Sequence, residues 1–293
     1  MLIENFRPGT MERFGFGYEA LQARNPKLIY ASITGYGSTG VLSNKIGFDL
    51  VMQGFSGLME LTGPENGEPH RLPIPVCDIV AGLFLTIGVL TALQGALEHG
   101  ERPARRRRRC SKRPYPHSST RRRRYSRPTL RPRSSDKSTG AWHAYQVFKT
   151  ASDHITIGVA QQNLWIRFCP LIGRLDLEAD PRFDTNTKRV SNIYDLVPII
   201  EETLASKSSN YWLNEMEKAG RPCRVIQTTD RALSNDHANA RAMVVPVMHP
   251  TARPTKTPGI PIKLSDTPGA IRSPAPLLGE HTEQVLKSIG AEI

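Results

Sequence analysis

Residues 73–97 read PIPVCDIVAGLFLTIGVLTALQGAL, and this stretch decides how the chain is organised. Its two prolines favour an extended start, because proline fixes φ and disfavours the helical region for the residue before it. From Ile79 to Leu97 no residue carries a charge. This run is close to the minimum length for a membrane span, but glycines, threonines and a glutamine interrupt it. We therefore expect a buried core helix, and neither a membrane anchor nor a membrane partner.

Asp78 stands where the extended segment meets this uncharged run. We expect it to occupy the N-cap of the helix, where free backbone N–H groups and the helix dipole favour an ionised carboxylate. Two interpretations are open at this point. Asp78 is a plain capping residue, or it is a nucleophilic carboxylate held at a helix start.

Strand and helix patterns alternate on either side of this helix. Residues 28–33 form an apolar run typical of a strand, and residues 11–24 and 48–60 have helical spacing. Residues 145–148 and 154–159 resemble a β-hairpin, and residues 163–172, 193–205 and 209–219 resemble amphipathic helices. A short helix is expected over 281–289. The alternation predicts an α/β or mixed α+β fold.

Three glycines, Gly35, Gly37 and Gly40, have the spacing of the dinucleotide-binding fingerprint and follow the predicted strand. The residues after Gly40 are a poor helix start, so no helix N-terminus is available for a pyrophosphate. The pattern alone is weak, and we expect no nicotinamide or flavin site.

The net charge of +12 is unevenly distributed. Residues 101–137 hold 16 basic and 2 acidic residues, whereas the rest of the chain holds 23 basic and 25 acidic ones. This block has almost nothing apolar to bury, so we expect residues 101–141 to be a disordered low-complexity segment. It either binds nucleic acid as a basic arm or is the product of a shifted reading frame.

The four cysteines, Cys77, Cys110, Cys169 and Cys223, stand singly along the chain. No CxxC pair and no histidine at zinc-ligand spacing accompanies them. The pattern predicts neither a disulfide framework nor a metal site, and it favours free thiols in a reducing compartment.

Several short motifs together resemble the family III CoA-transferases (the CaiB/BaiF or formyl-CoA transferase type). The similarity covers residues 2–100 and 142–290 in the family's order. The motifs are ENFRPGTM at 4–11, NPKLIYAS at 25–32, GYGSTG at 35–40, GFD at 47–49, SGLM at 56–59, PVCDIVAG at 75–82, YQVF at 145–148, DPRF at 180–183, GRPC at 220–223, LSD at 264–266 and LLGEHT at 277–282. Residues 30–37 and 62–67 look most like the succinyl-CoA:glutarate (hydroxymethylglutarate) group.

The resemblance implies an α/β fold with a partial Rossmann-like large domain and a smaller α+β domain. We expect the large, CoA-binding domain over residues 1–100, the basic segment over 101–141 and the small domain over 142–250. Residues 251–293 would return to the large domain as an extended segment and a C-terminal helix. In this family two chains interlock, so we expect a homodimer of the intact protein.

The resemblance also implies an enzyme that moves CoA from an acyl-CoA donor, such as succinyl-CoA, to a carboxylic and here dicarboxylic acid. Asp78 matches the family's nucleophile, which forms an aspartyl anhydride and then a thioester with CoA. Asn5, Phe6, Gly9 and Arg13 match positions that bind CoA. Coenzyme A is expected as part of the substrate, and no metal is expected.

Three departures from the family qualify this interpretation. The family has an earlier segment before the motif at residues 4–11, so we expect a truncated start. The basic block stands where the family continues with a turn and a helix. With both changes we expect little activity from this chain by itself. Related racemases carry a histidine at the position of Phe48, so a transferase is preferred to an acyl-CoA racemase or isomerase.

Two further expectations concern partners and location. A non-enzymatic protein that binds nucleic acid through the basic block is the alternative from another class, but we expect no nucleic-acid partner. The members with glutarate-type specificity are mitochondrial in eukaryotes, so a mitochondrial or cytoplasmic location is expected.

Overall fold

The computed structural model describes residues 1–293 except 66, 99–105, 111–143, 160, 252–253 and 291–293. The elements before the basic block are β1 (Leu2–Glu4), α1 (Thr10–Arg13), α2 (Tyr18–Arg24), β2 (Ile29–Ile33), α3 (Asp49–Phe55), α4 (Leu58–Thr62) and α5 (Val76–Glu98). The elements that follow are β3 (Arg106–Cys110), β4 (Ala144–Lys149), β5 (His154–Val159), α7 (Gln162–Leu171), α8 (Asp176–Ala179), α9 (Asn186–Ser191), α10 (Ile193–Leu204), α11 (Ser209–Lys218) and β6 (Cys223–Val225). The chain ends with α12 (Thr229–Ser234), α13 (Asp236–Ala240), β7 (Val244–Val247), β8 (Thr255–Pro258), β9 (Ile262–Leu264) and α14 (Thr282–Ser288).

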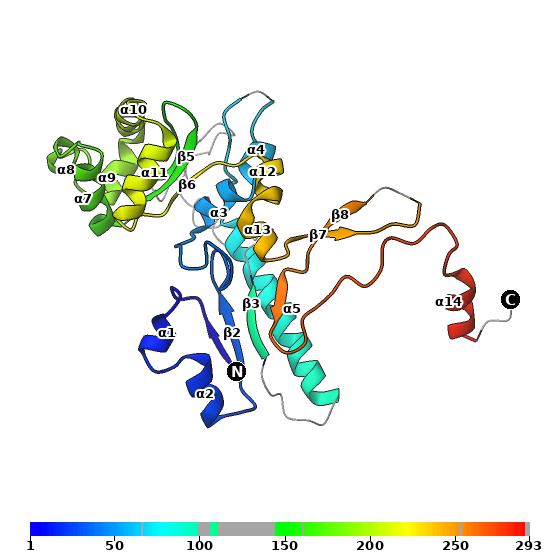
Figure 1. Ribbon diagram of the computed structural model, residues 1–293. Coiled ribbons are helices and arrows are strands. Elements are labelled where there is room, and N and C mark those ends of the chain that lie inside the picture. Colours follow the sequence, from blue (N-terminus) through cyan, green and yellow to red (C-terminus); the bar gives the residue numbers. More distant parts are fainter. Residues whose placement is uncertain (66, 99–105, 111–143, 160, 252–253, 291–293) are drawn as a thin grey trace, which may run out of the picture.

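A four-stranded sheet in the order β1-β2-β3-β9 forms the centre of the large part (Figure 1). Its strands β1, β2 and β3 are parallel, and β9 returns antiparallel to β3. The apolar run predicted as a strand is β2, and Ile29, Tyr30 and Ala31 in it are buried. The mixed α/β class expected from the sequence is confirmed.

Strand β3 lies within the segment expected to be disordered. Its backbone pairs with β2 from Ile29 to Ile33 and with β9 from Ile262 to Leu264. This corrects the expectation for these five residues, because backbone N–H and C=O groups pair with two neighbouring strands whatever the side chains are. The remaining residues of the basic segment lie outside those that the structure describes.

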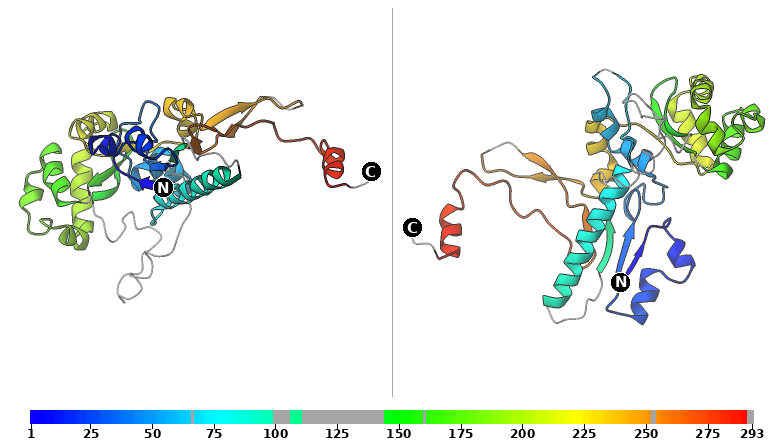
Figure 2. Two further views of the ribbon diagram at one scale, coloured as in Figure 1. Left: turned by 90° about the horizontal axis from the view of Figure 1, so that it is seen from below. Right: turned by 180° about the vertical axis from the view of Figure 1, so that it is seen from behind.

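Helix α5 lies along one face of this sheet, beside β2, β3 and β9 (Figures 1 and 2). Ala31 of β2 packs with Leu85 and Val89 of the helix. The opposite side of α5 carries exposed apolar side chains, so the helix is buried on one side only. By length and composition its residues Val76–Ala96 could cross a membrane, and 44% of the most apolar window is buried.

The small unit is a three-stranded antiparallel sheet, β4-β5-β6, covered by helices α7 to α11 (Figure 1). The predicted hairpin and the three amphipathic helices all form at the expected places. This unit contains the largest core of the described chain, which includes Trp165, Phe168 and Leu196. Helix α12 lies beside α4, and α13 contacts the glycine-rich loop of the large part. The β7-β8 hairpin and α14 extend away from these elements (Figure 1). The division into domains stays a prediction.

Candidate functional site

Asp78 lies in the first turn of α5, which begins at Val76. The sequence predicted the N-cap, so the helix starts earlier than expected. The reason is that the helix start is capped from elsewhere: the carboxylate oxygen Oδ1 of Asp49 accepts hydrogen bonds from the backbone nitrogens of Cys77 (2.7 Å) and Asp78 (3.3 Å). Asp78 therefore lies inside the first turn of α5 and not at the N-cap position expected from the sequence.

Asp78 lines a cleft of about 320 Å³. Three other segments contribute to the cleft: the loop after β1, the end of β2, and the loop that leads into α3. The lining residues are Asn5, Phe6, Arg7, Pro8, Ile33, Thr34, Gly35, Lys45, Ile46, Gly47, Phe48 and Asp78. Three of the residues singled out from the sequence, Asn5, Phe6 and Asp78, are thus brought together from distant parts of the chain.

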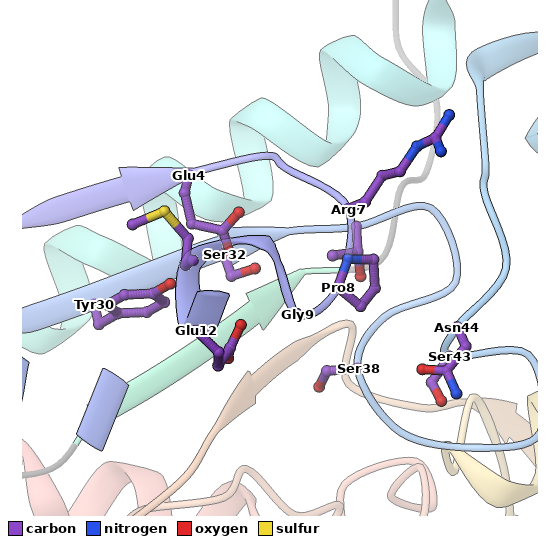
Figure 3. A pocket seen from close by; sticks show the side chains of 12 residues that line it. Glu4, Arg7, Pro8, Gly9, Glu12, Tyr30, Ser32, Ser38, Ser43 and Asn44 are labelled. Atoms are coloured by element: carbon purple, nitrogen blue, oxygen red, sulfur yellow. The ribbon is translucent and has the colours of Figure 1, made fainter. Parts of the chain in front are cut away.

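A second, smaller pocket of about 100 Å³ adjoins this cleft (Figure 3). Gly9 lines it, and Arg7 and Pro8 line both hollows. Figure 3 shows the side chain of Arg7 extending away from Glu4. Gly9 precedes α1 with a φ of 81°, a left-handed conformation that favours glycine.

Arg13 lines neither hollow. It is the last residue of α1, and its Nη2 donates to the hydroxyl of Thr10 at 3.3 Å. Of the four residues expected to bind CoA, Asn5 and Phe6 share the cleft with Asp78, Gly9 lies next to it, and Arg13 lies apart from it.

The glycine pattern at 35–40 serves packing in this structure. A Cβ on Gly35 would lie 2.6 Å from the Cα of Gly47, so two backbone segments meet there. Gly37 and Gly40 have φ near 80°, and side chains on them would clash with Arg241 and His237. No helix follows Gly40 directly, as expected, so this loop is not continued by a helix N-terminus that could bind a pyrophosphate.

His237 and Arg241, at α13 and directly after it, hold this loop. The ring nitrogen Nε2 of His237 is 2.8 Å from the carbonyl oxygen of Tyr36, and the backbone nitrogen of Leu42 donates to Nδ1 at 3.2 Å. These two contacts together assign the proton to Nε2. Burial lowers the pKa of His237, which favours this neutral form. Nη1 of Arg241 donates to the hydroxyl of Thr39 at 2.8 Å.

The charges around the cleft come from three side chains. Arg7 and Lys45 are cationic, and Asp78 contributes a carboxylate to the same lining. Lys45 also forms an ion pair with Glu217 of α11, which ties this wall of the cleft to the small unit. Such a lining suits a ligand with anionic groups. Within the described ranges, no three His, Cys, Asp or Glu side chains form a group that could hold a metal ion.

Asp49 is the buried charge next to this lining. Only 5% of its surface is exposed. Burial and, to a smaller extent, the nearby charge of Asp78 raise the pKa of Asp49 to about 6. The sequence places Asp49 in a family motif but indicates no role for it. His237 and Arg241 carry no sequence signal at all, since their partners lie about 200 residues away.

The chain matches the model of CoA-transferase family III over residues 1–282. It belongs to that family. The resemblance seen in the short motifs is thereby confirmed, and so is the expected fold class. The match extends over 282 of the 293 residues, and so covers the segments between the short motifs as well.

Named relatives have related activities. The chain is 32% identical to an acyl-CoA transferase of Fusarium pseudograminearum, over 100% of this chain and 64% of that protein. It is 29% identical to the human succinyl-CoA:glutarate CoA-transferase, over 99% of this chain and 66% of that protein. It is 31% identical to a succinyl-CoA:mesaconate CoA-transferase of Haloarcula hispanica, over 99% and 74%. The chain therefore spans about two thirds of the length of the first two.

Solved structures of similar fold point the same way. A CaiB/BaiF family protein from Brucella suis superposes with a TM-score of 0.50 at 27% identity, over 98% of this chain and 74% of that chain. A mutant of the Mycobacterium tuberculosis protein Rv3272 superposes with a TM-score of 0.51 at 26% identity, over 96% and 74%.

Proposed function

We propose that the protein transfers CoA from an acyl-CoA to a carboxylic acid and that Asp78 is the nucleophile. The observation that carries this proposal is the position of Asp78, which lines one cleft together with Asn5, Phe6 and the cationic side chains Arg7 and Lys45. Membership of CoA-transferase family III supports the reaction class. The similarity to enzymes named for glutarate and mesaconate supports a dicarboxylic acceptor and a succinyl-CoA donor.

The reaction follows from the chemistry of a carboxylate nucleophile. An oxygen of Asp78 attacks the thioester carbonyl carbon, the C–S bond breaks, and CoA leaves as a thiolate. The thiolate attacks the side-chain carbonyl carbon of Asp78, which releases the donor acid and leaves an aspartyl-CoA thioester. The acceptor carboxylate then displaces the thiolate to give a second anhydride. The thiolate attacks the carbonyl carbon of this anhydride that came from the acceptor. The new acyl-CoA is released and the carboxylate of Asp78 is restored.

The residues of the cleft have separate tasks in this scheme. The cationic groups of Arg7 and Lys45 attract anionic groups of the substrates and reduce the repulsion between Asp78 and an anionic ligand. Asn5 and Phe6 would bind CoA next to the nucleophile, and Gly9 and Arg13 would extend that contact. Phe48 lines the same cleft and offers no base for removing a proton next to the thioester. This arrangement favours transfer over racemisation.

The first test incubates the 293-residue chain with succinyl-CoA and searches by mass spectrometry for a covalent CoA adduct. We expect the adduct on Asp78, and none in Asp78→Ala or in Asp78→Asn, whose neutral amide is a poor nucleophile. Asp195→Ala is the matched control, because Asp195 is an exposed aspartate in the first turn of α10. An adduct on another carboxylate would overturn the assignment of Asp78.

The second test measures turnover with glutarate, oxalate and monocarboxylic acceptors. Faster transfer to dicarboxylic acids supports the proposed acceptor class, and equal rates with acetate would contradict it. The expectation that this chain alone has little activity stays a prediction, which the same assay decides. The interlocked homodimer and the mitochondrial or cytoplasmic location also stay predictions. Light scattering after gel filtration and fluorescence microscopy of the tagged protein test them.

A further inference from the structure

We propose that Asp49 and Gln53 of α3 act as a positioning pair, which fixes the first turn of α5 and so holds the carboxylate of Asp78 in the cleft. The proposal rests on the proposed role of Asp78 as the nucleophile. Asp49 and Gln53 are four residues apart on one helix, so their side chains lie on the same face. Both are buried, Gln53 completely.

The first contact is between Asp49 and the start of α5. The first backbone N–H groups of a helix have no acceptor within the helix. Oδ1 of Asp49 accepts from the nitrogen of Cys77 at 2.7 Å and from the nitrogen of Asp78 at 3.3 Å. One oxygen atom thus holds the amide of the proposed nucleophile itself. A displacement of Asp49 would move the backbone that carries the Asp78 side chain.

The second contact, between Gln53 and Asp49, fixes the orientation of the Asp49 carboxylate. Nε2 of Gln53 donates to Oδ2 of Asp49 at 2.7 Å and also lies 3.2 Å from the carbonyl oxygen of Ile74. Oε1 of Gln53 accepts from the nitrogen of Leu72 at 2.9 Å. The same side chain therefore connects Asp49 with the extended segment before α5. Both the approach to the helix and its first turn are attached to α3.

Capping a helix with a buried carboxylate costs free energy, because a charged group is removed from water. A serine or threonine can accept from the same backbone groups without burying a charge. Here a buried carboxylate lies close enough to Asp78 for the two charges to repel each other, which is one reason that the pKa of Asp49 is raised. Asp49 also directly follows the cleft residues Gly47 and Phe48. Asp49 therefore lies next to the residues that line the cleft, whereas an ordinary capping residue needs no such neighbours.

The main test compares variants of the 293-residue chain in the rate of adduct formation with succinyl-CoA. Asp49→Ala removes the acceptor, and we expect about a 100-fold slower rate, the scale of a misplaced catalytic group. Asp49→Asn keeps an oxygen acceptor for the two amides and should stay within about tenfold of the unaltered chain. An unchanged rate in Asp49→Ala, or equal losses in both variants, would overturn the proposal.

A second variant guards against misfolding of Asp49→Ala. Gln53→Met keeps the size of the side chain and removes its hydrogen bonds. We expect a slower rate with a normal apparent affinity for succinyl-CoA, since the ligand-binding side chains are unchanged. Asp195→Ala serves again as the control and should leave the rate unchanged. A weaker affinity with an unchanged limiting rate in Gln53→Met would contradict a positioning role.

An NMR measurement separates this proposal from the proposed function. In the ¹⁵N-cysteine-labelled chain, the amide of Cys77 should shift as the pH crosses about 6, where Asp49 titrates. This shift should vanish in Asp49→Asn. If the Cys77 amide signal responds neither to the pH change nor to Asp49→Asn, the proposed positioning contact is wrong. The expected shift together with an adduct on another carboxylate supports the contact and counts against Asp78 as the nucleophile.

Discussion

The small unit and the large part bury their apolar residues in different ways. In the small unit, helices cover the sheet, and side chains such as Trp165, Phe168 and Leu196 have no exposed surface. In the large part, α5 covers the sheet with one face, while Leu83, Ile87 and Leu90 on its other side are 51–59% exposed. A packed core therefore fixes the small unit. The cleft depends more on individual hydrogen bonds.

Helix α3 joins these two parts. Its residue Gly54 lies so close to β5 that a Cβ would be 2.9 Å from the Thr156 side chain. The carbonyl oxygen of Gly54 accepts from the nitrogen of Gln227 at 2.9 Å, and Leu50 packs with Val147. The helix that carries Asp49 thus rests on the small unit. Stability of the small unit should support the geometry of the cleft.

The largest effect is expected from Phe168→Ala in the small unit. Removing a buried phenylalanine should cost about 3–5 kcal/mol, through lost burial and the cavity left behind. Urea unfolding followed by tryptophan emission measures it, because Trp165 and Trp212 both lie in this core. If Phe168→Ala shifted the midpoint no more than an exposed substitution, the small unit would not have the tight core described above.

A smaller effect is expected on the pH dependence of the stability of the large part, through Asp49. The pKa of Asp49 is raised from an ordinary 3.8 to about 6, so the folded state holds this proton at a pH where the unfolded chain has lost it. Stability from this group is therefore lost as the pH rises from about 4 to about 6. The shift corresponds to about 3 kcal/mol.

Asp49→Asn should flatten this part of the pH profile. The melting temperature measured between pH 4 and pH 7 tests it, with Asp195→Asn as a control that leaves the profile unchanged. A profile that is as steep in Asp49→Asn as in the unaltered chain would show that another group causes it.

The smallest effect is expected on the outer face of α5. Leu90 is 59% exposed, so Leu90→Gln should change the free energy of unfolding by no more than about 0.5 kcal/mol. Leu85→Ala on the buried side of the same helix should cost about 2–5 kcal/mol. Urea titrations of both variants give the comparison. A loss above about 1 kcal/mol in Leu90→Gln would mean that this face is covered in solution.

The sequence was sufficient where the signal is local. The apolar run at 28–33, the hairpin around residue 151 and the amphipathic helices of the small unit each carry their pattern within a few residues, and all of them form. Asp78 could be singled out because an extended, proline-containing segment meets an uncharged helix there. Its place in the cleft with Asn5 and Phe6 came from the family resemblance.

Features that depend on distant contacts could not be predicted in the same way. The expected helix over 48–60 is divided into α3 and α4, because Gly57 adopts a φ of 78° with the backbone of Thr229 against it. The capping of α5 by Asp49 joins residues 28 and 29 positions apart. Strand β3 forms from arginines because its neighbours supply backbone partners. None of these has a local pattern.

The contact between His237 and Tyr36 has a consequence for how the protein is made. The two residues are 201 positions apart in the chain. A ribosome adds about 5–20 residues per second, so roughly 10–40 s pass between them during synthesis. For that time the glycine-rich loop has been translated without the histidine that holds it. The cleft can reach its final form only after the small unit has left the ribosome, and a pause in translation before α13 would prolong the interval in which the cleft is incomplete.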